Sequence, residues 1–201
     1  MSPRPLPARD KLTLCFAHVA YRMGERFALR NAGIGRIGSR LATLAKAFDM
    51  RVIAVRRDPS KGAGAADKVV GEEGLLSMLP QADFVALTCP LTPKTENLID
   101  AKALAAMKPS AYLINVARGK VVNEPALVEA LNEKRIAGAA LDCVWEEPLP
   151  ATSELWGVPN VLITPHTAGE TRRYEDNVID LLLENLERLW RGEAVLKNQF
   201  V

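Results

Sequence analysis

The stretch GIGRIG, Gly33–Gly38, has glycine at its first, third and sixth positions, and an amphipathic helical pattern follows it. By itself this pattern is a weak indication, since glycine is common at any turn between a strand and a helix. The context is stronger, because the apolar run VIAV ends at Val55, about twenty residues farther on, which is the spacing of a dinucleotide-binding βαβ unit. In such a unit the first glycine permits the tight turn, the second lets a pyrophosphate approach the backbone, and the third lets helix pack on strand. The candidate cofactor contacts in this loop are Gly33, Gly35, Arg36, Ile37 and Gly38.

From this loop onward, short apolar runs alternate with helical patterns. The runs are nearly continuous in apolar residues, as are strands of a parallel sheet that is covered on both faces. Strands that alternate with helices require right-handed crossovers, so the sequence predicts an α/β fold, a Rossmann-like doubly wound parallel sheet with helices on both faces. The expected strands are Met50–Val55, Lys68–Val70 as a short edge strand, Asp83–Cys89, Ala111–Ala117, Gly138–Val144 and Asn160–Thr164.

Helical patterns fill the intervals between these strands and the end of the chain. Asp100 and Asn123 are the expected N-caps of two helices, and Pro125 lies in a first turn, where its missing N–H does no harm. Pro80 is expected to end another helix. The expected helices are 35–48, Glu72–Leu79, Ala101–Met107, Glu124–Glu133 and Thr171–Arg191.

Composition places the chain among soluble globular proteins. It has 201 residues, 48% hydrophobic and 25% charged, and a formal net charge of +2, which suggests neither nucleic acid nor a membrane surface as an obligatory partner. No apolar run reaches the length of a membrane span. Cys15, Cys89 and Cys143 are odd in number and form no C-x-x-C pair, so we expect unpaired thiols, no metal site and a cytoplasmic location.

The residue at the end of the second strand indicates whether the cofactor is NAD or NADP. An acidic residue there would accept hydrogen bonds from the adenosine ribose 2′-hydroxyl, but this chain has Arg56 in that position and Arg57 next to it. An arginine cannot accept a hydrogen bond, and its fork suits a 2′-phosphate. NADP is therefore favoured over NAD. Asp58 keeps NAD open, and two solvated arginines at a strand end are the alternative that involves no ligand.

Three further candidates follow predicted strands in the second half of the chain. Arg118, Glu147 and His166 lie at or beyond strand ends, where ligands of a doubly wound sheet bind, so the three side chains can converge on one crevice. Reduction of a 2-oxo acid needs a histidine that protonates the carbonyl oxygen as hydride arrives. It also needs a carboxylate that orients the histidine and an arginine that holds the substrate carboxylate.

Several ordered motifs give the chain a family resemblance. They are GIGRIG, PLTPKTENLI, MKPSAYLINVARG, VVNEPALVEAL, AGAALDCVWEEPLP and LITPHTAG. From about Gly33 to Val201 the chain closely resembles the D-isomer-specific 2-hydroxyacid dehydrogenases, the group that contains glyoxylate/hydroxypyruvate reductases and phosphoglycerate dehydrogenases. The resemblance implies an NAD(P)-dependent oxidoreductase that acts on a small 2-oxo or 2-hydroxy acid, with a homodimer as the favoured assembly.

The same resemblance implies roles for individual residues. Arg118 binds the substrate, Glu147 pairs with the histidine, and His166 is the acid/base. Asp142 contacts the nicotinamide carboxamide. The cofactor groove is lined by Pro90, Thr95, Val116, Ala117, Arg118 and the backbone beside His166, including Ala168 and Gly169.

Each candidate also has a purely structural interpretation. Arg118 could be a loop arginine, Glu147 part of a solvated acidic pair with Glu146, and His166 a strand cap. Asp142 could bind a neighbouring loop. Trp145 could belong to the core or to the groove wall, His18 is expected to be structural or exposed, and Cys89 and Cys143 are expected to be buried and inert.

The region before the glycine loop departs from the family pattern. The segment RFALRNA places Arg30 and Asn31 where a central strand should be apolar, so we expect either a shifted register or a region that does not form the usual core. Residues 1–24 form a poorly defined segment, expected to be disordered at its start, and 25–201 the NAD(P)-binding domain. The substrate domain of the family is not recognisable in residues 1–32, which suggests a truncated or rearranged chain.

This departure leaves other functions open. A non-catalytic nucleotide-binding fragment or module is the main alternative to an active dehydrogenase. An acid dehydrogenase of another Rossmann family is disfavoured, because such families do not present this order of arginine, glutamate and histidine motifs.

Overall fold

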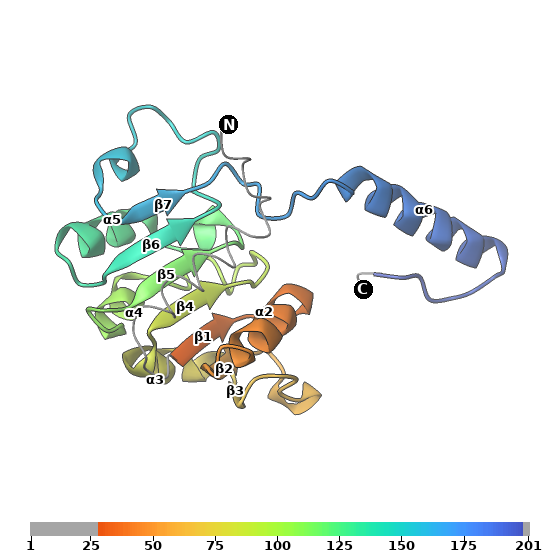
Figure 1. The fold of residues 1–201 in the computed structure, drawn as a ribbon, viewed down its shortest axis with the longest axis horizontal. Coiled ribbons are helices and arrows are strands. Elements are labelled where there is room, and N and C mark those ends of the chain that lie inside the picture. Colours follow the sequence, from red (N-terminus) through yellow and green to blue (C-terminus); the bar gives the residue numbers. More distant parts are fainter. Residues whose placement is uncertain (1–27, 199–201) are drawn as a thin grey trace, which may run out of the picture.

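Seven parallel strands form one sheet in the computed structural model, which describes residues 28–198 of the chain. Their order is β3-β2-β1-β4-β5-β6-β7, so the chain builds outward in one direction from β1, returns, and builds outward in the other (Figure 1). The predicted Rossmann-like doubly wound sheet is thereby confirmed. The strands are β1 (Ala28–Ala32), β2 (Arg51–Val55), β3 (Lys68–Val70), β4 (Phe84–Leu87), β5 (Tyr112–Asn115), β6 (Gly138–Leu141) and β7 (Val161–Ile163).

The strand that the sequence put in doubt is part of the sheet. The backbone of β1 pairs with β2 from Ala28 opposite Arg51 to Ala32 opposite Val55, and with β4 from Leu29 opposite Phe84 to Ala32 opposite Leu87. The backbone of this segment therefore forms a central strand, and the expectation of a shifted register or an unusual core stays a prediction. Residues 1–24, with the predictions made for Cys15 and His18, lie outside the described residues.

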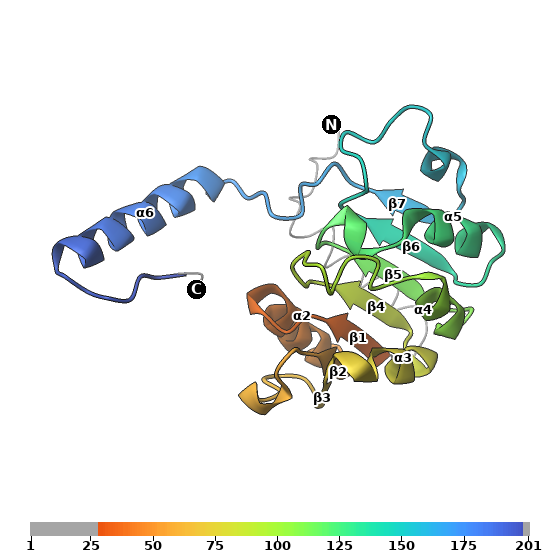
Figure 2. The same ribbon diagram turned by 180° about the vertical axis from the view of Figure 1, so that it is seen from behind.

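Helices cover both faces of the sheet, as predicted. Helix α2 (Arg36–Lys46) buries Gly38, Ala42 and Ala45 against one face, where they pack with residues of β2 and β4. The opposite face carries α3 (Leu75–Met78), α4 (Ala101–Ala106) and α5 (Glu124–Asn132). Figures 1 and 2 show the two layers from opposite sides.

Two helix starts follow the predicted capping chemistry. The Asp100 side chain accepts a hydrogen bond from the Ala103 N–H, and the Asn123 side chain accepts one from the Ala126 N–H. The helix expected over Glu72–Leu79 is only partly α-helical, because α3 lies between two 3₁₀ turns, Glu72–Gly74 and Leu79–Gln81. Pro80 lies within the second turn, which avoids the i→i−4 hydrogen bond that proline cannot donate.

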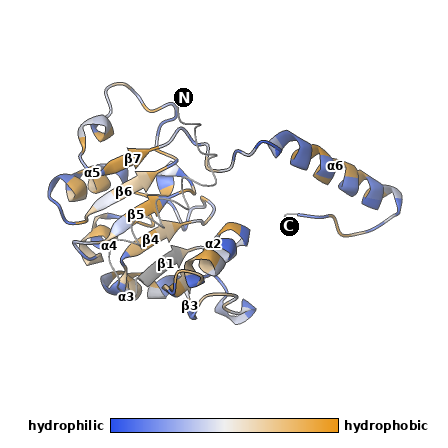
Figure 3. Ribbon diagram, viewed as in Figure 1, coloured by the Kyte–Doolittle hydropathy of each residue, from blue (hydrophilic) through white to orange (hydrophobic). Residues whose placement is uncertain are grey.

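The last helix, α6 (Tyr174–Trp190), is separated from the body of the molecule. It has no buried residue, and both views show it at the end of an extended segment (Figures 1 and 2). Apolar residues nevertheless recur along it (Figure 3). Among the helices described, none is long and apolar enough to cross a membrane.

Candidate active site

The predicted site residues gather at one edge of the sheet because all its strands are parallel. Gly33 follows β1, Arg56 follows β2, Val116 follows β5 and Asp142 follows β6. His166 follows β7 in the same way. The strand order divides the candidate residues into two groups. The glycine loop and Arg56 follow β1 and β2, and Arg118, Glu147 and His166 follow β5, β6 and β7. The change of direction falls between β1 and β4, which is where doubly wound sheets bind ligands.

The glycine loop leaves the first turn of α2 open. Gly33 has φ +116°, and a Cβ on it would approach the Cys89 backbone nitrogen to 2.8 Å, so this position requires glycine. Gly35 is the N-cap of α2, no side chain caps it, and a Cβ there would meet nothing within 4 Å. The first turn carries no acidic residue. A helix start that no side chain caps, open space and the positive end of the helix dipole together suit an anionic pyrophosphate.

Arg56 lies at the predicted position after β2, but it is partly engaged. Its Nη1 donates to the carbonyl oxygens of Lys61 and Gly62, at 3.1 and 3.0 Å. Asp58, the residue that kept NAD open, caps the turn Pro59–Lys61 instead, and hydrogen bonds from the Ser60 hydroxyl and backbone N–H hold its pKa below the ordinary value. Arg57 is exposed.

Threonine hydroxyls hold the loop after β4. The Thr95 hydroxyl donates to the Pro90 carbonyl oxygen at 2.7 Å and accepts from the Thr92 N–H at 2.7 Å. Pro90 is exposed and Thr95 half-buried, so both lie at the surface of the carboxyl edge. The hydroxyl of Thr88 donates to the Gly33 carbonyl oxygen at 2.7 Å, which ties this loop to the glycine loop.

A buried asparagine shapes the turn that carries Arg118. The Asn115 side chain, 1% exposed, accepts from the Ala117 N–H and donates to the Arg118 carbonyl oxygen, both at 3.0 Å. Val116 is half-buried, Ala117 is buried, and Arg118 is exposed. A Cβ on Gly119 would overlap the Val144 carbonyl, so the turn after β5 packs directly against the loop that carries Glu147.

Asp142 anchors the loop that presents the histidine. Its carboxylate accepts hydrogen bonds from the Thr164 hydroxyl at 2.6 Å and from the Thr167 and Ala168 N–H groups at 3.0 Å. Within this loop His166 has φ +53°, a backbone conformation that non-glycine residues rarely adopt. Ala168 and Gly169, both exposed residues, follow in the same turn.

His166 and Glu147 form a direct pair. The distance between His166 Nδ1 and Glu147 Oε2 is 2.7 Å, and Glu147 Oε1 accepts from the Val144 N–H at 3.1 Å. Partial burial raises the pKa of Glu147, but the hydrogen bonds from His166 and Val144 and the charges of His166 and Arg118 outweigh it, and the pKa lies below the ordinary value. The side chains of His166 and Glu147 are 43% and 38% exposed.

The structure brings Arg118 into the electrostatic range of this pair, since its charge lowers the pKa of Glu147. Cys143 lies in the same region and is buried, with its thiol directed at the Asn115 carbonyl oxygen at 3.8 Å. Burial, with the negative charges of Glu147 and Asp142, raises the pKa of Cys143 to about 12. Cys143 is therefore buried as predicted, whereas Cys89 is only half-buried, and burial raises the pKa of its thiol as well.

Sequence reasoning missed the polar residues that hold the site together. Three of these residues position the site through hydrogen bonds: Asn115, Thr164 and Glu124. Glu124 accepts a hydrogen bond from the Trp145 backbone N–H at 2.9 Å. The Trp145 indole donates to the Val122 carbonyl oxygen at 2.6 Å, so this half-exposed ring fastens the loop before Glu147. A polar residue at the end of an apolar strand, as Asn115 is, was the signal available in the sequence. No cluster within residues 28–198 could hold a metal ion.

Comparison with known proteins agrees with this geometry. Residues 27–168 match the model of the NAD-binding domain of the D-isomer specific 2-hydroxyacid dehydrogenases. A glyoxylate reductase from Pyrococcus furiosus is 42% identical over 163 residues, which are 80% of this chain and 47% of the relative. An (S)-sulfolactate dehydrogenase from Chromohalobacter salexigens is 41% identical over 158 residues, 78% of this chain and 50% of the relative.

A solved structure shows the same arrangement. A D-isomer specific 2-hydroxyacid dehydrogenase from Xanthobacter autotrophicus Py2, in complex with NADPH and MES, superposes with a TM-score of 0.80 at 34% sequence identity. The match covers 96% of this chain and 81% of that one. The chain spans about half the length of the curated relatives that it matches.

Proposed function

The chain belongs to the D-isomer specific 2-hydroxyacid dehydrogenase family through its NAD-binding domain, and on this premise we propose that it binds NADP(H) and takes part in hydride transfer to a small 2-oxo acid of the glyoxylate or hydroxypyruvate type. The observation that carries the proposal is the 2.7 Å His166–Glu147 pair, positioned after β6 and β7 of the sheet that also carries the open glycine loop.

The residues present fit a dinucleotide. The uncapped first turn of α2 offers backbone N–H groups to the pyrophosphate, and Gly35 leaves the space for it. When bound, the nicotinamide would supply the hydride. Pro90, Thr95 and Val116 are proposed to line the groove. Asp142 accepts three hydrogen bonds from its own chain, and a carboxylate has about four lone-pair positions, which leaves room for the nicotinamide carboxamide.

NADP is preferred over NAD in this proposal. Asp58 is occupied as a cap, whereas Arg56 uses only Nη1 on neighbouring carbonyls and keeps the rest of its fork for a 2′-phosphate. The solved relative in complex with NADPH supports the preference. Arg56→Gln is expected to raise the Kd for NADPH about tenfold while the Kd for NADH changes little, which parallel fluorescence titrations measure. An equal loss for both cofactors would contradict the assignment.

Three side chains divide the proposed chemistry. Glu147 holds His166 through Nδ1, so Nε2 is the ring atom left to carry a proton to the carbonyl oxygen. Glu147 also stabilises the positive form of the ring. Arg118, the exposed cation of this group, binds the substrate carboxylate.

Turnover tests this assignment. Purified chain is mixed with NADPH and glyoxylate or hydroxypyruvate, and the loss of NADPH absorbance is followed. Activity that falls at least a hundredfold in kcat with His166→Gln, and rises in KM with Arg118→Gln, is expected. NADPH binding with no oxidation by any 2-oxo acid would contradict catalysis by this chain.

One observation favours a second candidate, a nucleotide-binding module without catalysis. His166 and Glu147 are both more than a third exposed, whereas hydride transfer uses sites from which water is excluded. Tight NADPH binding without turnover is the outcome that this candidate predicts. In either case we propose residues 25–201 as one NAD(P)-binding domain, a homodimer, and a cytoplasmic location that the unpaired Cys89 and Cys143 support.

A further inference from the structure

The loop that carries Glu147 is exposed, so burial does not hold the glutamate in place. Glu146, Glu147 and Pro148 all lie at the surface. Glu147 Oε2 lies 2.7 Å from His166 Nδ1, and Glu147 Oε1 accepts a hydrogen bond from the Val144 N–H at 3.1 Å. The direction of the carboxylate therefore depends on where the backbone of this loop lies.

Trp145, which follows Val144 in this loop, is fastened at two points. Its backbone N–H donates to Glu124 Oε2 at 2.9 Å, and its indole Nε1–H donates to the Val122 carbonyl oxygen at 2.6 Å. Both acceptors belong to one short segment, residues 122–124, which leads into α5. A shift of the loop would break one or both bonds and leave their donors unpaired, so the two contacts oppose such a shift.

The segment that accepts these bonds is part of the packed body of the molecule. Val122 is 2% exposed, and Glu124 is half-buried. Next to them, the Ile99 N–H donates to the Val121 carbonyl oxygen at 3.1 Å, and the Asn123 N–H donates to the Ile99 carbonyl oxygen at 2.9 Å. Glu124 also lies in the first turn of α5, where the helix dipole favours a carboxylate. The exposed loop is thus attached to a firmer part of the chain.

The same segment begins directly after the turn that carries Arg118. The Val122 N–H donates to the Gly119 carbonyl oxygen at 3.0 Å, which closes that turn. A Cβ on Gly119 would overlap the Val144 carbonyl, so the turn and the loop are in direct contact. The two bonds of Trp145 therefore join the loop of the glutamate to the turn of the arginine.

We propose that Glu124 and Trp145 are positioning residues, which hold Glu147 against His166 and in register with Arg118. This inference rests on the proposed function, since it concerns how the proton donor and the substrate-binding arginine are kept at a fixed separation. Groups that take part in a reaction must be held within about 0.5 Å of their productive geometry. The loop of the histidine has an anchor of its own, so the two contacts of Trp145 act on the glutamate side of the pair.

The ring nitrogens of His166 report the position of Glu147 without any cofactor. The chain has two histidines, so in a His18→Gln background His166 gives the only imidazole signals. At about pH 9 an ordinary histidine is neutral, with its proton on either Nδ1 or Nε2, and ¹⁵N NMR distinguishes the two forms. Because the Glu147 carboxylate lies at Nδ1, the parent ring is expected to carry its proton there. Glu147→Ala, which removes the carboxylate, gives the reference for a ring without this partner.

Substitutions of Trp145 and Glu124 test the two contacts. Trp145→Phe keeps an aromatic ring and removes the indole donor, and Glu124→Met keeps a long side chain and removes the acceptor. Each is expected to move the His166 proton from Nδ1 towards Nε2, part of the way to the Glu147→Ala reference, and the double variant most of the way. Glu124→Gln retains an acceptor oxygen and should restore the parent signals. A double variant with the parent signals would overturn the proposal, and so would a Glu124→Gln chain that behaves like Glu124→Met.

Trp156→Phe is the matched control for the indole contact. The Trp156 indole donates to the Pro150 carbonyl oxygen at 2.9 Å, so the substitution removes the same kind of hydrogen bond within another part of the chain. It should leave the His166 signals unchanged. Signals that move as far as they do in Trp145→Phe would show that lost stability, not positioning, moves the ring, and would overturn the proposal.

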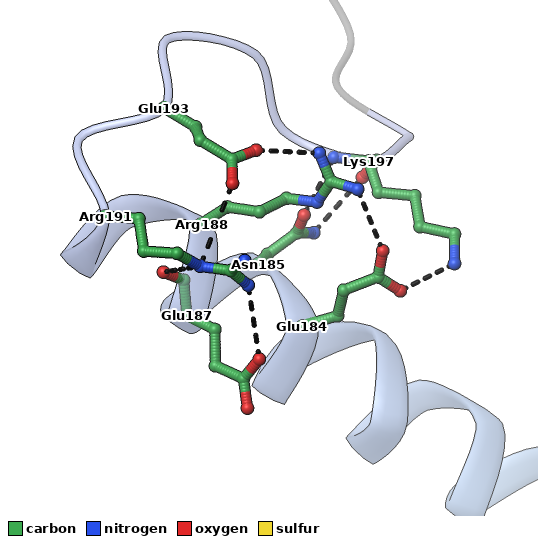
Figure 4. A network of polar contacts seen from close by, with 7 residues as sticks. All are labelled: Glu184, Asn185, Glu187, Arg188, Arg191, Glu193 and Lys197. Atoms are coloured by element: carbon green, nitrogen blue, oxygen red, sulfur yellow. Dashed lines mark hydrogen bonds and ion pairs between the residues drawn. The ribbon is translucent and has the colours of Figure 1, made fainter.

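Glu184→Met is the matched control for the glutamate. Glu184 is a half-buried residue of α6 that accepts from Lys197 Nζ at 2.6 Å and from Arg188 at 3.1 Å, within the polar network of α6 and the segment after it (Figure 4). The substitution removes a glutamate that binds two neighbours, and it should not change the His166 signals. A change equal to that of Glu124→Met would contradict the specific role of Glu124.

Turnover gives a second readout in a chain that oxidises NADPH with a 2-oxo acid. The double variant is expected to lower kcat about tenfold or more, while KM for the 2-oxo acid changes less than about twofold, because Asn115 holds the turn of Arg118 independently. A rise in KM with kcat unchanged would overturn the assignment. Absence of turnover in the parent chain would contradict the proposed catalysis, whereas the expected changes of the ring signals would still support the positioning of Glu147.

Discussion

Cys143 is enclosed by the candidate site, and its chemistry follows from that position. Burial first, and then the negative charges of Glu147 and Asp142, raises the pKa of its thiol to about 12. The reactive thiolate is therefore rare at neutral pH. Iodoacetamide at about pH 8 is expected to leave Cys143 unmodified in the native chain and to label it in urea, as peptide mass spectrometry would show. Fast labelling of native Cys143 would contradict the packing between β5 and β6.

Glu147 gives the pair with His166 a pH dependence of defined sign. Its pKa is lowered in the folded chain, so its contribution to stability is present above the unfolded pKa and is lost as the pH falls through the folded value. Because the side chain is partly exposed, the contribution is about 1 kcal/mol or less.

Urea unfolding of Glu147→Gln at several pH values measures this contribution. The variant should be less stable than the parent chain near neutral pH, and the difference should shrink below about pH 4. Glu146→Gln is the control, as Glu146 is its exposed neighbour and should show no such difference. A stability difference between Glu147→Gln and the parent chain that grows as the pH falls would contradict the pairing of Glu147 with His166.

Asp142 accepts three hydrogen bonds from the loop that carries His166, so its removal should loosen that loop. Asp142→Ala leaves these donors without their partner and is expected to destabilise the chain by about 3 kcal/mol. Asp100→Ala, which removes only a helix cap, should cost about 1 kcal/mol. Urea unfolding compares the two, and hydrogen exchange should accelerate at 164–168 in the first variant alone. If both variants lost the same stability, and hydrogen exchange at 164–168 stayed unchanged, Asp142 would not anchor the loop.

At the scale of elements, two glycines of the loop are expected to have different roles: Gly33 is needed for stability and Gly35 for cofactor binding. Gly33→Ala meets the backbone of Cys89 at a positive φ and is expected to cost roughly 2–4 kcal/mol of stability. Gly35→Ala meets nothing within 4 Å and has φ −79°, so its stability should change by less than about 1 kcal/mol. Its methyl group would instead occupy the space of the pyrophosphate and raise the Kd for NADPH about tenfold or more. Thermal unfolding and NADPH titration of both variants check this contrast. A Gly35→Ala chain that binds NADPH normally would contradict the placement of the cofactor.

Much of the element order was predictable because apolar runs and caps are local signals. Asp100 and Asn123 cap the helices that the sequence assigned to them. Strand ends were predicted too far along the chain, as with Ala111–Ala117, because the residues after β5 are apolar but form the turn before Arg118. The sequence predicts the anchoring role of Asp142 only as an alternative to a cofactor contact, since a contact across 25 residues depends on the register of β6 and β7.

At the scale of the molecule, periodicity predicted α6 but not its position. The helix expected over Thr171–Arg191 forms as α6, yet its apolar residues Val178, Leu182 and Leu189 are exposed. A helical pattern shows that an apolar face exists without showing what covers it. The meeting of Arg118, Glu147 and His166 was predictable for a different reason, because parallel strands bring all residues after their ends to one edge.

The proposed function requires that the sheet hold the glycine loop of residues 33–38 in a conformation that binds a dinucleotide. The most direct test is a fluorescence titration of the purified chain with NADPH and with NADH. Saturable binding of both, with the lower Kd for NADPH, is the predicted result. Stronger binding of NADH would contradict the role given to Arg56, and no binding of either would contradict the central claim itself.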